Sequence, residues 1–122
     1  MQRVLVIAAA VVLVLHGLIH LMGTAAYLKL ANVTGIPYKT TLLNRRWDVG
    51  DTGIRVFGVL WTVAAFGFIV AAVALLAGST WWRSVLLAIT GLSLVLTALD
   101  WNVAFAGVFV NVAILAVLFF AR

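Results

Sequence analysis

Hydrophobic positions along the chain fall into four long apolar runs separated by three polar interruptions. Each run reaches the length of about 20 residues that an α-helix needs to cross a bilayer. The pattern therefore predicts an all-α integral membrane protein with one four-span transmembrane domain over residues 1–122. The expected spans are about 4–28, 53–77, 80–99 and 103–120.

The interruptions differ in length, and this difference predicts the topology. The second and third are only a few residues long, so consecutive spans should lie side by side as an up-and-down antiparallel bundle. The first is a longer polar loop at about 29–52, which holds the only proline, Pro37. Within it, about Leu30–Leu43 is a candidate interfacial helix, and Asp51 is well placed to cap the second span.

Composition supports a membrane protein, because 66% of the residues are hydrophobic, 9% are charged and the mean hydropathy is +1.26. The formal net charge is +5. The cations flank the apolar spans, where they orient and anchor helices, so we exclude nucleic acid as a partner. The absence of cysteine excludes disulfides, thiolate metal sites and thiol catalysis.

The distribution of cations predicts an orientation in the cell membrane. Four spans place both termini and the second interruption on one side, with Arg3, Arg83 and Arg122. The opposite side carries more cations, namely Lys29, Lys39, Arg45, Arg46 and Arg55. The positive-inside rule therefore favours a cytoplasmic long loop in a multi-pass protein.

The first span contains the motif HGLIH, in which His16 and His20 lie one helical turn apart on the same face. Ionisable side chains inside a membrane span are costly and mark functional sites. At a rise of 1.5 Å per residue, His16 lies roughly 18 Å from the start of its span, beyond the midplane. Both histidines therefore lie toward the long loop.

Other polar residues converge on the same half of the bundle. Each span carries one polar or small-residue stripe, which marks the face that packs inward. On the third span the stripe is Thr90, Ser93, Thr97 and Asp100. We expect a one-ended polar cavity whose candidate catalytic residues are His16, His20, Arg55 and Asp100. The candidate ligand-binding residues are Tyr27, Arg45, Arg46, Trp47, Asp48, Asp51, Thr62, Trp101 and Asn111.

Such a cavity suits a lipophilic small molecule, whose polar head would meet the ionisable groups while the aliphatic half of the bundle accepts its hydrocarbon part. Because histidine carries protons near neutral pH, the protein could also isomerise or hydrolyse that molecule. One alternative is an accessory or structural subunit of a membrane complex, with buried ionisable groups that pair only with one another.

A second alternative is a proton- or ion-conducting bundle, and a third is metal or haem bound at His16 and His20. We predict no particular cofactor, because no third ligand is fixed and the glutamate of an HExxH motif is missing. The expected partners are the bilayer, a lipophilic small molecule, and a second copy or a larger membrane complex. The chain resembles small four-span bacterial membrane proteins in general appearance, a resemblance that implies no function.

Overall fold

The computed structural model describes residues 2–120 and contains four α-helices. They are α1 (Gln2–Tyr27), α2 (Gly50–Leu76), α3 (Trp82–Leu99) and α4 (Trp101–Phe120). All four are long and apolar enough to span a membrane, which indicates a multi-pass membrane protein. The prediction of four apolar helices is confirmed, with bounds within a few residues of those expected.

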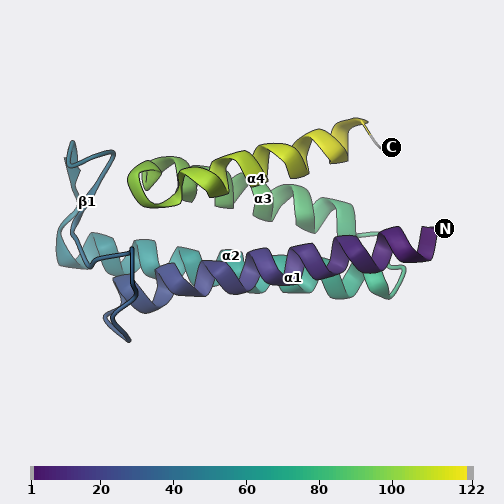
Figure 1. Ribbon diagram of the computed structural model, residues 1–122, viewed down its shortest axis with the longest axis horizontal. Coiled ribbons are helices and arrows are strands. Elements are labelled where there is room, and N and C mark those ends of the chain that lie inside the picture. The colour runs from purple at the N-terminus through teal and green to yellow at the C-terminus, as the bar shows by residue number, and fades with distance from the viewer. Residues whose placement is uncertain (1, 121–122) are drawn as a thin grey trace.

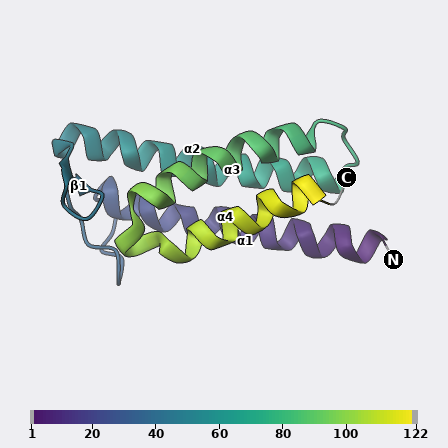
Figure 2. The ribbon, with the colours of Figure 1, turned by 90° about the horizontal axis from the view of Figure 1, so that it is seen from above.

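Consecutive helices run in opposite directions and form two layers, with α1 and α2 in one and α3 and α4 in the other (Figures 1 and 2). Helix α1 packs along α2, α2 along α3, and α3 along α4, whereas α1 and α4 approach each other closely at few positions. We call the line between α1 and α4 the seam. The N-terminus and the α2–α3 turn lie at one end of the molecule, the terminal end, and the long connection lies at the other, the loop end (Figure 1).

Small residues allow α1 and α2 to lie close together. A Cβ atom added at Gly17 of α1 would lie 2.8 Å from the carbonyl oxygen of Ala65 in α2. A Cβ atom at Gly58 of α2 would lie 3.1–3.2 Å from the side chains of Leu28 and Tyr27. Helices in a membrane gain little by moving apolar side chains out of apolar lipid, so they pack through small residues that let their backbones approach closely. This tight pair is the platform on which α3 and α4 are placed.

The long connection forms a β-hairpin, so the expected interfacial helix at about Leu30–Leu43 is wrong. Strands β1 (Thr41–Leu42) and β2 (Trp47–Asp48) pair antiparallel. The turn between them has positive φ at Leu43, Asn44 and Arg45, and Gly35 has a φ of 85°. Left-handed backbone at these positions, together with the missing N–H of Pro37, is incompatible with a continuous helix.

The expected cap at Asp51 is also wrong. Helix α2 is preceded by Val49, without a side-chain cap, and Asp51 lies inside its first turn. The Asp51 carboxylate instead accepts a hydrogen bond of 2.5 Å from the Tyr38 hydroxyl. This hydrogen bond raises the pKa of the Tyr38 phenol, because a nearby carboxylate disfavours phenolate. The hydrogen bond between Asp51 and Tyr38 thus connects the loop to the start of α2.

A matched pair of glycine substitutions tests the packing of α1 on α2. We expect Gly17→Ala to destabilise the protein by about 1–3 kcal/mol, because the new methyl group would push against the backbone of α2. Gly91 lies in α3 with nothing within 4 Å of an added Cβ. Gly91→Ala should therefore stabilise the protein by up to about 1 kcal/mol through helix propensity. Thermal unfolding followed by circular dichroism in one detergent measures both changes, and shifts of the same sign would contradict this packing.

Candidate functional site

Four buried side chains from three helices form a closed set of hydrogen bonds. His20 donates from Nδ1 to the His16 carbonyl (2.7 Å), so its Nε2 accepts the Ser93 hydroxyl proton (2.6 Å). Asn111 donates from Nδ2 to Ser93 Oγ (2.8 Å), and its Oδ1 accepts the Nε2–H of His16 (2.9 Å). We call these residues the polar ring. Each of these contacts joins a donor to an acceptor with both histidines neutral.

Thr97 fixes the orientation of the Asn111 amide in the polar ring. The Thr97 hydroxyl donates to the Ser93 carbonyl oxygen at 2.8 Å, so its oxygen is left to accept from Asn111 Nδ2 at 3.2 Å. The amide nitrogen therefore faces α3, and the amide oxygen faces His16. Such a satisfied network in apolar surroundings holds its members in one arrangement.

Asp100 is the second polar centre, at the junction of α3 and α4. Its side chain is 1% exposed and accepts hydrogen bonds from the Tyr27 hydroxyl and from Lys39 Nζ, the latter at 2.5 Å. The Asp100 carbonyl oxygen accepts the backbone N–H groups of Val103 (2.9 Å) and Ala104 (2.8 Å). Asp100 thereby connects α1, the loop and the start of α4.

A cavity of about 390 Å³ lies at the loop end of the seam, between α1 and α4. His16, His20, Asp100 and Trp61 contribute to its wall, and residues 34–36 of the loop border it. Apolar side chains complete the lining, among them Ile19, Met22, Val103 and Val110. We call this space the polar cavity. It brings imidazole, carboxylate and indole groups together beside a hydrocarbon surface.

Four of the predicted site residues meet around this cavity: His16, His20 and Asp100 in its wall, and Asn111 behind His16. The expectation that Arg55 joins them is wrong, because Arg55 is exposed and does not line the cavity. The buried face of α2 includes Ile54, Gly58 and Trp61. Arg55 follows Ile54 by one residue, which turns it about 100° away from that face.

The other predicted ligand-binding residues do not line the polar cavity. Tyr27 is paired with Asp100, and Thr62 shares a hydrogen bond of 2.9 Å with Thr24. The rest lie on the surface at the loop end, namely Arg45, Arg46, Trp47, Asp48, Asp51 and Trp101. The exposed Trp101 ring instead packs near Phe105 and Phe109, with centroid distances of 6.2 Å.

Sequence reasoning missed four residues of the site. Ser93 and Thr97 lie on the polar stripe of the third span, which signalled an inward face but no specific role. Trp61 resembles any other apolar position of α2, and Lys39 resembles the other loop cations. Only the folded loop places Lys39 on Asp100.

The donor set does not fit a metal centre. Residues 2–120 contain no group of three histidine, cysteine, aspartate or glutamate side chains that could share one ion. Both ring nitrogens of His20 are already hydrogen-bonded. No protein-family model, curated protein or solved structure matches the chain. The function must therefore be argued from the site itself.

Removing the partner of Asp100 tests this ion pair. We expect Lys39→Met to destabilise the protein by on the order of 2–3 kcal/mol, since a buried carboxylate loses its counter-ion while Lys39 is itself partly solvated. Asp100→Asn in the same chain should restore most of this loss, because the amide needs no counter-ion. The double-mutant cycle is measured by thermal unfolding, and strictly additive changes would show that the pair is not coupled.

Proposed function

We propose that this protein binds a compact lipophilic small molecule in the polar cavity, within an up-and-down four-helix bundle that spans the cell membrane with its long loop in the cytoplasm. The observation that carries the proposal is the cavity itself, in which His16, His20 and Asp100 meet an apolar wall. Its volume of about 390 Å³ lies within the range of small-molecule sites, about 300–1,000 Å³. The hydrocarbon part of the ligand would contact Ile19, Met22 and Val103.

The charges around the cavity favour a neutral, oxygen-containing ligand. Lys39 already balances Asp100, and the polar ring is satisfied with neutral histidines. Trp61 is 6% exposed, and its indole N–H has no acceptor within residues 2–120. A buried donor without a partner costs about 1–3 kcal/mol. A carbonyl or hydroxyl oxygen of the ligand would satisfy this donor after a small rotation of the indole ring, because the nitrogen has almost no exposed surface in the ligand-free fold.

Acid–base chemistry is the reaction class that this wall supports best. His16 borders the cavity and has one ring nitrogen, Nδ1, outside the polar ring, so it could exchange a proton with a bound molecule, as isomerisation or hydrolysis would require. His20 would act beside it by holding the polar ring, because both of its ring nitrogens are already hydrogen-bonded. Ser93 lies 2.6 Å from His20 but is fully buried and does not line the cavity. We therefore assign Ser93 to holding His20 in place, and we assign it no nucleophilic role.

The second candidate function is that of an accessory subunit in a membrane complex. Two observations favour it: the polar ring closes on itself, and α4 exposes an aromatic row of Trp101, Phe105 and Phe109. Exposed aromatic surface is also suited to lipid contact. The two functions differ in whether the polar cavity must stay open.

Filling the cavity tests the binding function. Ala106 lines the polar cavity and is exposed, whereas Ala98 is an exposed α3 residue outside its lining. We expect protein purified gently from its native membrane to carry one small lipophilic species, detected by mass spectrometry of organic extracts. Ala106→Trp should lose at least about tenfold of that species, corresponding to about 1.4 kcal/mol, and Ala98→Trp should retain it.

Equal retention by the wild type and both tryptophan variants would overturn the binding function. The subunit function would then be supported if both variants still co-migrate with the same larger complex on native gels. Loss of the complex in both variants would indicate general damage to the surface of the bundle, which the unfolding temperature of each variant reveals independently.

A second substitution tests the role assigned to the indole N–H. Trp61→Phe keeps an aromatic ring beside His20, whose centroid lies 5.0 Å from that of Trp61, but removes the unpaired donor. We expect the stability of the ligand-free protein to change by less than about 1 kcal/mol, because a smaller ring is offset by the loss of an unsatisfied group. Bound ligand should fall severalfold in the extraction assay. Unchanged ligand content would contradict a hydrogen bond from Trp61.

A further inference from the structure

A second hollow lies in the seam toward the terminal end and meets the polar cavity at Val110. It has a volume of about 580 Å³ and is bounded by α1, α3 and α4 together with Leu75 of α2. Its walls are mostly aliphatic, with Leu5 and Val12 on one side and Leu86 and Ile114 on the other. We call it the apolar groove. Its volume and aliphatic lining suit a hydrocarbon chain.

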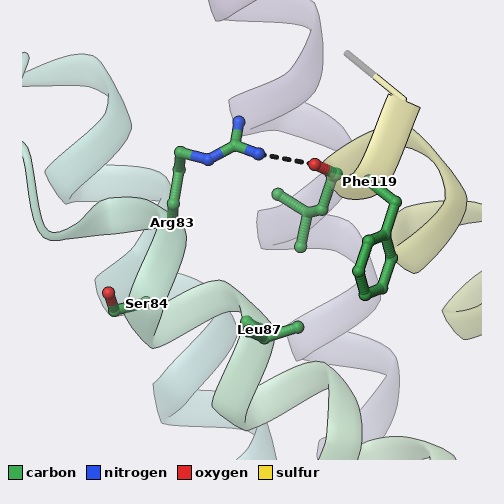
Figure 3. A pocket seen from close by; sticks show the side chains of 5 residues that line it. Arg83, Ser84, Leu87 and Phe119 are labelled. Carbon is green, nitrogen blue, oxygen red and sulfur yellow. Dashed lines mark hydrogen bonds between the residues drawn. The ribbon is translucent and has the colours of Figure 1, made fainter. Parts of the chain in front are cut away.

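Arg83 supplies a cation at one end of this groove. Its Nη2 donates to the Leu118 carbonyl oxygen at 2.5 Å, as the dashed line in Figure 3 shows, and its guanidinium lies 5.4 Å from the Trp82 ring centroid. A smaller adjoining hollow of about 280 Å³ is lined by Arg83, Ser84 and Phe119. Arg83 and Leu118 line both spaces. A head and a chain of one molecule could therefore occupy them together.

Charge at the terminal end favours an anion. All three acidic residues of the chain, Asp48, Asp51 and Asp100, lie at the loop end or in the long connection. The terminal end carries Arg3 and Arg83, at the starts of α1 and α3. Within residues 2–120 Arg83 forms no ion pair with a carboxylate. Such a cation attracts a phosphate, and the five donors of a guanidinium match phosphate geometry.

We propose that the apolar groove and the hollow beside Arg83 form a binding site for an anionic phospholipid of the surrounding bilayer. Its phosphate contacts the free guanidinium donors of Arg83, and one acyl chain lies along the groove between α1 and α4. The N–H groups of the first turn of α3 add favourable partial charge. This site is separate from the polar cavity and does not depend on the function proposed for it.

Native mass spectrometry of the delipidated protein with added phosphatidylglycerol or phosphatidylcholine of the same acyl chains tests this site. We expect the wild type to retain phosphatidylglycerol about tenfold more strongly, because both lipids carry the phosphate but phosphatidylcholine also brings a quaternary ammonium cation close to Arg83. Arg83→Gln keeps a donor for the Leu118 carbonyl but should abolish this preference. Arg3→Gln removes the same charge outside the groove and should preserve it. A preference that survives Arg83→Gln, or that Arg3→Gln abolishes, would overturn the proposal.

The acyl-chain half of the proposal is tested on α1. Ala9 lines the apolar groove, and its neighbour Ala8 is also exposed but lies outside the lining. Ala9→Trp should reduce retention of both lipids severalfold, whereas Ala8→Trp should not. Retention unchanged by Ala9→Trp would overturn the placement of the chain. Thermal unfolding of each variant confirms that the helices remain folded.

Discussion

A buried carboxylate without a counter-ion is among the most costly groups that a protein can carry. Asp100 is a buried carboxylate, and the groups that must pair with it hold the loop end of the molecule together. Its partners are Tyr27 from α1 and Lys39 from the loop, while its own backbone caps the turn from α3 into α4. The loop also contacts this junction through the Leu43 N–H, which donates to the Leu99 carbonyl oxygen at 2.9 Å. The hairpin and the α3–α4 turn are therefore held in one arrangement, and that arrangement positions residues 34–36 over the polar cavity.

The polar ring also consists of buried polar groups that need partners, and it lies further from the loop end. Helix α4 has only two buried residues, Asn111 and Leu118, so apolar packing fixes it weakly. Asn111 compensates by bonding to His16 of α1 and to Ser93 and Thr97 of α3. In apolar surroundings these bonds have no competition from water, although each contributes only about 1 kcal/mol. Specific polar contacts thus decide where α4 lies.

The sequence predicted the four helices because apolar runs of membrane length are an unambiguous signal. It also predicted that His16, His20, Asp100 and Asn111 would meet, since helical spacing and depth are properties of one helix at a time. Arg55 was misplaced because helical spacing alone does not fix where the edge of the inward face of α2 lies. The contact with α1 buries Ile54 and leaves Arg55 outside that face. The ion pair of Lys39 was not predictable, because it depends on a loop whose path is set by left-handed turns.

The two hollows share one physical origin. Helix α4 packs on α3 and barely approaches α1, so the seam stays open on either side of the hydrogen bond between His16 and Asn111. Val110 lines both spaces, which places them end to end on one line. What distinguishes them is the distribution of charge among residues 2–120: carboxylate and imidazole groups lie at the loop end, and Arg83 lies at the terminal end, where these residues include no acidic side chain. A single departure from closed packing therefore creates two sites, and the segregation of polar residues along the helices gives each site its own ligand chemistry.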